Sequence, residues 1–202
     1  MLGKNKISIT ATRQLYRARR NSLSAGQQVL AGKKLLQQCQ TLPCFHEAQY
    51  IACYLACDGE ISLQPLIDYC WAVNKIVCLP VLHPFCPGHL LFLRYTAHSV
   101  MVVSRYKIAE PLLRCDHIVP LKKLDVILTP LVAFDQLGQR LGMGGGFYDR
   151  TLAPISRDAL GTTVLGVAHD CQLYETGLHT QRWDIPMQKV ITPEHIYIGS
   201  AN

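Results

Sequence analysis

The most constraining feature of this chain of 202 residues is a glycine-rich segment, Gly138 to Arg150, which contains five glycines among thirteen residues. Glycine weakens regular structure, but without Cβ its backbone can approach a ligand closely enough for N–H groups to cradle phosphate oxygens. The residues that follow favour a helix over 147–155, whose N-terminus would be a second anion site. The segment predicts a phosphate-binding loop, and the alternative is a flexible glycine-rich surface turn.

The residues before this loop support a phosphate-binding role. The apolar run 125–135 is bounded by turn signals and predicts a buried strand of a parallel sheet. Strand, glycine loop and helix is the order in which α/β proteins place a ligand at the carboxyl ends of strands. Two nucleotide motifs do not match: no Gly-Lys-Ser/Thr follows, and the alternating glycines end at Phe147 rather than completing G-x-G-x-x-G.

The run Arg140-Leu-Gly-x-Gly-x-Gly-Phe-Tyr-Asp149 resembles the signature of the 5-formyltetrahydrofolate cyclo-ligase family, also called methenyltetrahydrofolate synthetases. The resemblance extends over about residues 13–193 and rests on an ordered set of matches. These further matches are Thr129-Pro130, Phe134-Asp135, Cys57-Asp58-Gly59-Glu60, Leu79-Pro80 with the following Val-Leu-His-Pro, Gly166-Val-Ala-His169-Asp170 and Trp183-Asp184-Ile-Pro186.

Composition predicts a globular, cytoplasmic protein. The hydrophobic content of 49% and charged content of 17% fit a single domain, 1–202, with a sizeable core. No apolar run reaches the roughly 18 residues of a membrane helix, and residues 1–12 lack a secretory apolar region. The nine cysteines include no C-x-x-C pair, which indicates reduced thiols. A metal cluster of Cys39, Cys44 and His46 is disfavoured, because recognisable zinc-ligand pairs are missing.

The apolar pattern predicts a three-layer α/β/α fold with a mostly parallel sheet. Strands are expected at 49–55, 75–80 and 163–168, with 189–192 as the last strand, and shorter strands at 90–95 and 99–103. A helix over 62–73 joins the first two strands, and the loop 83–89 is expected to be a turn rather than a metal site.

Basic residues are concentrated at the N-terminus. Residues 1–46 contain eight Lys or Arg and no Asp or Glu, whereas the remainder contains twelve basic and fourteen acidic residues. Two basic helices within 6–40, at 14–20 and 25–38, are expected to pack on the domain, the second capped by Ser24. Their arginines allow three interpretations: a solvated helix face, a nucleic-acid-binding surface, or a clamp on nucleotide phosphates.

The family resemblance favours the phosphate clamp for Arg13. Family members carry two basic residues four apart on this helix, and Ile9 departs from the first position. Lys6 is a candidate replacement, and Arg17 is a weaker phosphate candidate. Some members also carry Arg and Lys where Met143 and Gly145 stand, and we hypothesise that Arg150 replaces the missing charge.

Glu60 follows the first strand at the edge where α/β sheets bind ligands. Its carboxylate could accept paired N–H donors from a planar heterocycle, and the resemblance implies that it holds the pterin with Leu55. The alternative is that Glu60 caps the helix that starts near Ser62. Asp149 and Asp184 could share a hard cation, which the resemblance identifies as Mg²⁺; the alternative for Asp184 is a turn before Pro186.

The resemblance implies conversion of 5-formyltetrahydrofolate and ATP to 5,10-methenyltetrahydrofolate, ADP and phosphate, with Mg²⁺. Arg140 and Tyr148 are the implied catalytic residues. The implied ATP-binding residues are Arg13, Arg140, Leu141, Gly142, Met143, Gly144, Gly145, Gly146, Phe147 and Tyr148. The implied substrate-binding residues are Leu55, Glu60, Met143, Gly144, Gly145, Gly146 and Phe147. An aromatic side chain near the folate is implied at Tyr106.

Two other classes of function stay open: a different small-molecule kinase or ligase on the same scaffold, and a nucleic-acid-binding module that uses the basic N-terminus. Few aromatic residues accompany those basic residues, which disfavours base stacking. The resemblance implies a folate as the partner, and we expect a monomer without nucleic acid or membrane.

Overall fold

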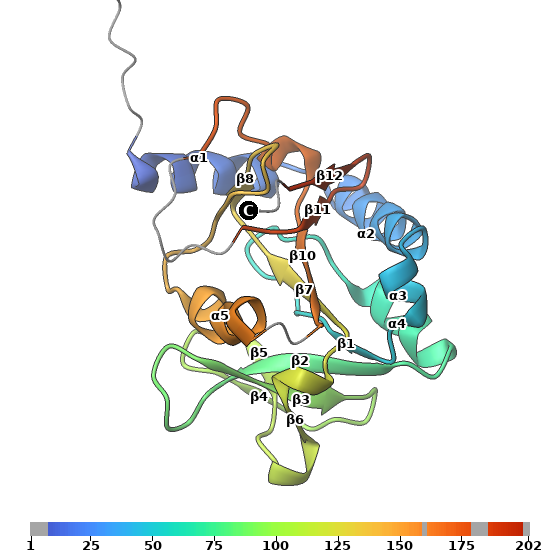
Figure 1. Ribbon diagram of the computed structural model, residues 1–202. Helices are drawn as coiled ribbons and strands as arrows, with labels where there is room; N and C mark the ends of the chain where they lie inside the picture. Colours follow the sequence, from blue (N-terminus) through green and yellow to red (C-terminus); the bar gives the residue numbers. More distant parts are fainter. Residues whose placement is uncertain (1–7, 159–160, 179–185, 200–202) are drawn as a thin grey trace, which may run out of the picture.

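The computed structural model describes residues 8–158, 161–178 and 186–199 (Figure 1). Its main sheet contains β1 (Tyr50–Ala52), β2 (Ile76–Leu82), β3 (Leu90–Tyr95), β6 (Ile118–Val119), β7 (Val126–Pro130), β10 (Thr163–Val167), β11 (Lys189–Ile191) and β12 (Ile196–Ile198). Two small sheets pair β4 (Met101–Val103) with β5 (Ala109–Pro111) and β8 (Ala133–Phe134) with β9 (Arg140–Leu141). The helices are α1 (Ile9–Asn21), α2 (Ala25–Gln40), α3 (Pro43–Glu47), α4 (Gln64–Ala72) and α5 (Phe147–Asp158).

The main sheet is parallel at its centre and antiparallel at its margins. Its strand order is β12-β11-β10-β7-β1-β2-β3-β6. The four pairings from β11 to β2 are parallel, and those that add β12, β3 and β6 are antiparallel. Helix α4 connects the parallel neighbours β1 and β2, which is the strand–helix–strand succession that we expected. The predicted α/β fold with a mostly parallel sheet in a single domain is confirmed.

Each face of the sheet is covered by a different set of helices. Side chains alternate along a strand, so Val126 and Leu128 of β7 pack toward one face and Ile127 toward the other. The first face lies under α2, α3 and α4, and the second lies under α5 (Figure 1). Because both faces are buried, the strand is apolar throughout, as the sequence pattern indicated.

Helix α1 lies across the carboxyl ends of the central strands (Figure 1). Its Tyr16 is buried against Val132 and Ala133, which follow β7, and lies 5.8 Å from Tyr174, which follows β10. Helix α2 begins as predicted, because Ser24 and Gln27 exchange side-chain-to-backbone hydrogen bonds in a capping box. The basic first helix therefore packs over the edge at which α/β sheets bind ligands.

Four sequence-based boundaries are wrong. The first helix, expected at 14–20, begins five residues earlier, at Ile9, where Ser8 caps it. The run 125–135 is not one strand, because the chain turns after Pro130 into the β8–β9 hairpin, where the Val132 N–H donates to the Leu141 carbonyl over 2.7 Å. The strand expected at 49–55 ends at Ala52. The strand at 189–192 is not the last, because Ile196–Ile198 adds an antiparallel edge strand that is too short to give a periodic signal.

Candidate active site

A cavity of about 1520 Å³ lies at the carboxyl ends of β1, β2 and β7. It is lined by the described residues of the predicted ATP, folate and metal sites, whereas the weaker phosphate candidate Arg17 does not line it. The residues of these sites are Arg13, Leu55, Glu60, Arg140, Leu141, Gly142, Met143, Gly144, Gly145, Gly146, Phe147, Tyr148 and Asp149. Asp184, the second expected metal ligand, and Lys6 lie outside the described residues.

One end of the cavity is formed by the glycine loop. Gly144 and Gly146 have φ angles of 97° and 65°, a left-handed conformation that side chains other than glycine rarely adopt. The Arg13 Nε donates to the Gly142 carbonyl over 2.9 Å, and its Cζ would lie 3.3 Å from a Cβ added at Gly144. The loop is thus held in the cavity wall by α1, which does not fit a flexible surface turn.

Arg150, which also lines the cavity, supports the same loop. Its Nε donates to the Gly88 carbonyl over 3.0 Å, and its Nη2 donates to the Gly145 carbonyl. The guanidinium therefore ties the glycine loop to the 83–89 turn. A direct role for Arg150 on bound phosphates stays a prediction.

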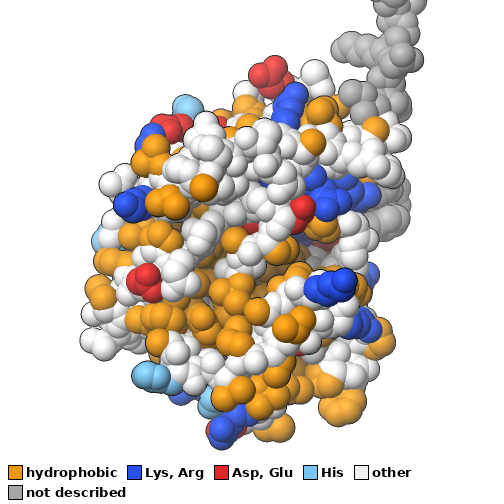
Figure 2. Space-filling view, turned by 180° about the vertical axis from the view of Figure 1, so that it is seen from behind, with side chains coloured by type: hydrophobic (Ala, Val, Ile, Leu, Met, Phe, Trp, Pro, Cys, Tyr) orange, Lys and Arg blue, Asp and Glu red, His pale blue; other side chains and the backbone are white. Residues whose placement is uncertain are grey.

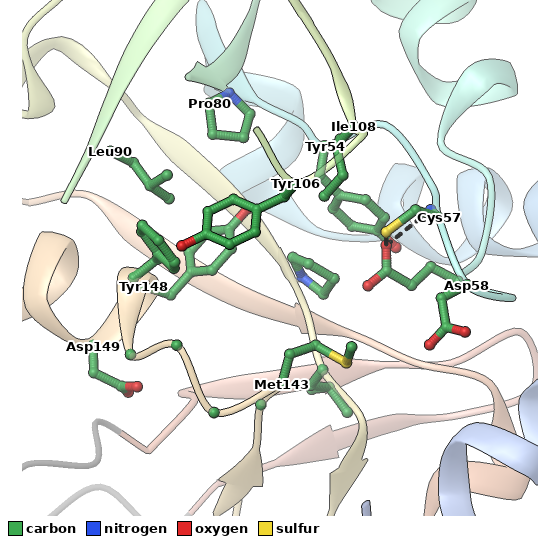
Figure 3. Close-up of a pocket in the computed structure, with 18 of the residues that line it drawn as sticks. Tyr54, Cys57, Asp58, Pro80, Leu90, Tyr106, Ile108, Met143, Tyr148 and Asp149 are labelled. Atoms are coloured by element: carbon green, nitrogen blue, oxygen red, sulfur yellow. Dashed lines mark hydrogen bonds between the residues drawn. The ribbon is translucent and has the colours of Figure 1, made fainter. Parts of the chain in front are cut away.

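The β8–β9 hairpin places Arg140 beside the start of α5. The Arg140 side chain is 4% exposed, and its Nη2 forms an ion pair with Oδ1 of Asp149. Asp149 lies in the first turn of α5, where a carboxylate is favoured by the helix dipole. Its side chain retains 23% exposure and lies on the same side of the cavity as Tyr148 (Figure 3). The site thus combines a buried cation with a partly accessible carboxylate.

Tyr54, Cys57 and Asp58 lie across the cavity from Asp149 (Figure 3), and Glu60, which binds Cys57, forms this second end. One of the Glu60 oxygens, Oε2, accepts the Cys57 N–H over 3.1 Å and the Cys57 thiol over 3.5 Å. The side chain is only 8% exposed. Burial raises the pKa of Glu60, while the Cys57 N–H and the Arg20 guanidinium act in the opposite direction.

The helix-capping alternative for Glu60 is wrong. Helix α4 begins at Gln64, and its N-cap residue Leu63 makes no side-chain capping bond. Glu60 directs its carboxylate to Cys57 instead.

Apolar side chains line the space between the two ends, among them Leu55, Pro80 and Leu90. Tyr148 projects into this region (Figure 3). Burial, together with the negative charge of Glu60, raises the pKa of the Tyr148 phenol, so the phenol stays protonated near neutral pH and can donate a hydrogen bond. Tyr106 of the β4–β5 loop packs edge-on against Phe147 with ring centroids 5.7 Å apart and lines the cavity.

Sequence reasoning missed Arg20, the most deeply buried charged residue near the cavity. Its side chain is 0% exposed and binds Asp58, through the carbonyl at 2.7 Å and Oδ2 at 2.9 Å. Arg17 also binds Asp58 Oδ2 at 2.7 Å, and it is not among the cavity residues. The sequence did carry one signal for this contact. No acidic residue precedes Glu47, so any carboxylate that pairs with the arginines of the first helix must come from later in the chain.

Other groups in the described part of the chain do not form a metal centre. No three His, Cys, Asp or Glu side chains among these residues gather closely enough to hold an ion. The nine cysteines are all free thiols. Within the same described ranges, no helix is both long and apolar enough to cross a membrane. In the face shown in Figure 2, apolar side chains gather in the lower part, and Lys and Arg side chains are spread around the periphery.

An α/β fold with one large cavity at the carboxyl ends of its parallel strands, lined by a glycine loop and convergent charged groups, is the architecture of a small-molecule enzyme. Comparison with known proteins specifies the class. The model of the 5-formyltetrahydrofolate cyclo-ligase family matches residues 5–193. The chain belongs to this family of ligases.

Individual members of the family align with this chain over most of its length. The chain is 48% identical over 183 residues to the 5-formyltetrahydrofolate cyclo-ligase of Escherichia coli K12, which covers 91% of this chain and 99% of the relative. It is 44% identical to the Haemophilus influenzae protein of the same name, covering 85% and 90%. The NMR structure of Aquifex aeolicus 5,10-methenyltetrahydrofolate synthetase superposes with a TM-score of 0.81 at 26% identity, covering 97% and 95%.

Proposed function

We propose that this protein catalyses the ATP- and Mg²⁺-dependent cyclisation of 5-formyltetrahydrofolate to 5,10-methenyltetrahydrofolate, with release of ADP and phosphate. The observation that carries the proposal is the shared cavity, in which the glycine loop with Arg13 faces a second end formed by Glu60. One end has the chemistry to bind phosphates, and the other has the chemistry to bind a planar heterocycle with N–H donors.

The proposed reaction has two steps. The oxygen of the N5-formyl group attacks the γ-phosphorus of ATP. The bond between the γ-phosphorus and the β,γ-bridging oxygen breaks, and ADP leaves. The N10 amine of the same folate then attacks the activated formyl carbon, the C–O bond breaks, and phosphate leaves with the electron pair while N10 loses its proton. Because both nucleophiles belong to the substrates, the protein contributes mainly alignment and charge stabilisation.

The phosphate end would stabilise the charge that moves in the first step. The glycine loop leads into the N-terminus of α5, where backbone N–H groups and the helix dipole favour an anion. Arg13 lies against Gly142 and Gly144, so its guanidinium is placed beside any phosphate held by that loop. Arg140 adds a buried positive charge at the same end.

Asp149 suits a Mg²⁺ ion held partly by the nucleotide. Mg²⁺ is often bound by one or two carboxylates, with substrate phosphates and waters completing its octahedron. The Asp149 carboxylate is partly exposed to the cavity beside Arg140 and can serve as the protein ligand, and Asp184 is the proposed second ligand. When bound, the ion would neutralise phosphate charge.

The folate end would select and orient the second substrate. Glu60 can accept N–H groups from the pterin edge, while Leu55 and the neighbouring apolar wall cover its flat faces. The protonated Tyr148 phenol projects between the two ends, where it can orient the formyl group. A folate bound in this way would have its formyl oxygen toward the glycine loop.

The test is absorbance at the methenyl band after 5-formyltetrahydrofolate is mixed with the protein, with and without Mg·ATP. We expect a rise only when ATP and Mg²⁺ are both present. Arg13→Gln should raise the KM for ATP by about 10- to 100-fold, because a charge-assisted contact to phosphate is lost. Arg19→Gln on the same helix is the matched control, since Arg19 is exposed and stacks over Tyr16 rather than facing the cavity.

One outcome of this test favours an alternative function, and the structure bears on another. If ATP binds but no folate is converted, a different small-molecule kinase or ligase reaction on this scaffold is favoured. A nucleic-acid-binding module is disfavoured by the fold, because Arg17 and Arg20 bind Asp58 and Arg13 binds the glycine loop. We propose that the enzyme acts as a cytoplasmic monomer on a folate, without nucleic acid.

A further inference from the structure

The residues that present Glu60 form a tight, left-handed turn. The Glu60 N–H donates to the Cys57 carbonyl over 3.0 Å, and the two central residues, Asp58 and Gly59, have φ angles of 49° and 74°. Positive φ at both central positions defines a type I′ turn. A Cβ at Gly59 would approach the Asn21 side-chain oxygen to 2.6 Å, so α1 packs directly on the turn.

A turn of this kind outside a hairpin needs partners for its backbone, and buried side chains provide them. Arg20 Nε donates to the Asp58 carbonyl over 2.7 Å. The Gly59 carbonyl is contacted at 3.2 Å by the Gln28 amide nitrogen and at 3.2 Å by Nε2 of His169. Arg20 and His169 are 0% and 3% exposed, so two of these three donors are buried, whereas Gln28 is half-buried.

Arg20 joins this turn to the rest of the cavity wall. Its Nη1 donates to the Leu131 carbonyl over 3.1 Å, just after β7, while Nη2 binds Asp58 Oδ2. The same Nη2 lies 3.7 Å from Oε1 of Glu60, the carboxylate oxygen that does not bind Cys57. One guanidinium therefore contacts the turn's carbonyl, its aspartate and its glutamate.

We propose that Arg20 is the positioning residue for folate recognition, because it holds the Cys57–Glu60 turn in place and keeps the Glu60 carboxylate aimed into the cavity. This inference rests on the proposed function, in which Glu60 binds the pterin. Arg20 does not line the cavity and would act only through Glu60.

The position of Arg20 on α1 predicts which substrate site its loss would affect. Arg13 contacts the glycine loop, and Arg20 contacts the turn two helical turns later on the same helix. Loss of the Arg20 contacts should therefore weaken the folate end while Arg13 still holds the nucleotide end. A general loss of folding would weaken both ends together.

The experiment compares Arg20→Lys and Arg20→Gln with Arg17→Gln, measuring KM for 5-formyltetrahydrofolate, KM for ATP and kcat. Arg17 is the matched control because it forms a more exposed ion pair with the same Asp58 oxygen, and within the described part of the chain its side chain makes no hydrogen bond or ion pair with the turn backbone or Glu60. We expect the folate KM to rise at least about tenfold in both Arg20 variants, more in Arg20→Gln than in Arg20→Lys. The ATP KM should stay within about twofold, and Arg17→Gln should stay close to wild type.

Parallel increases in both KM values, or an unchanged folate KM in a folded Arg20→Lys protein, would overturn the inference. If Arg20→Gln does not fold, Arg20→Lys provides the same comparison, because it keeps a cation but not the planar fork. Wild-type turnover keeps the two proposals distinct. Absence of wild-type turnover refutes the proposed function, whereas wild-type turnover with an unchanged folate KM in Arg20→Lys refutes only the role of Arg20.

Discussion

Mild acid should destabilise this protein through His169. The imidazole is 3% exposed, and its Nε2 faces the Gly59 carbonyl at 3.2 Å. Burial lowers the pKa of His169 to about 4 from the ordinary 6.5, and Arg20 adds to the effect against the opposing hydrogen bond to Gly59. Protonation therefore favours the unfolded chain. The stability that the neutral, buried His169 imidazole contributes is complete above pH 6.5 and is lost as the pH falls toward 4.

The size of the loss follows from these two pKa values. With 6.5 in the unfolded chain and about 4 in the folded chain, linkage predicts a loss of about 2 kcal/mol at pH 5. The loss approaches about 3 kcal/mol below pH 4. That is a substantial part of the 5–15 kcal/mol that typically stabilises a domain.

Urea unfolding followed by tryptophan fluorescence at pH 7.5, 6 and 5 measures this effect. His169→Gln is the informative variant, because its amide can still donate to Gly59 but does not titrate in this range. Between pH 7.5 and 5 the wild type should lose about 2 kcal/mol more than His169→Gln. The exposed His98→Gln serves as the control and should follow the wild type. Equal losses in wild type and His169→Gln would refute the reasoning.

Two packing predictions use the same unfolding measurement. Gly32→Ala should destabilise by about 1–3 kcal/mol, because its Cβ would lie 2.8 Å from the Ser62 carbonyl between α2 and α4, whereas Gly26→Ala at the open start of α2 should be neutral or stabilising. If Gly32→Ala changed the free energy of unfolding no more than Gly26→Ala, the close approach of α2 to the residues before α4 would not constrain Gly32. Phe45→Ala should cost about 3–5 kcal/mol because the ring is 0% exposed, and Phe85→Ala, at 87% exposure, should change stability by less than about 0.5 kcal/mol. Similar values for the two phenylalanines would contradict the assigned core.

Much of the architecture is encoded in local patterns. The apolar residues of β7, the glycine loop and the first turn of α5 follow one another with only the β8–β9 hairpin between them, so their order alone predicts a ligand site at the carboxyl edge of a sheet. The Ser24 capping box is likewise local, since its partner Gln27 is three residues away. Family resemblance then placed Arg13 and Glu60 at a shared site, and the structure brings both to one cavity.

Tertiary structure decided the features whose partners are distant in sequence. Arg20 lies 38 residues from Asp58, and His169 lies 110 residues from Gly59, so no helical or strand period could relate them. The short edge strand Ile196–Ile198 exists because β11 offers it backbone partners, not because three residues carry a pattern. Local chemistry determined which segments could bind a phosphate or a heterocycle. Only the packing of α1 over the sheet edge determined which buried groups hold the Glu60 turn, because burial and long-range hydrogen bonds arise from the complete fold.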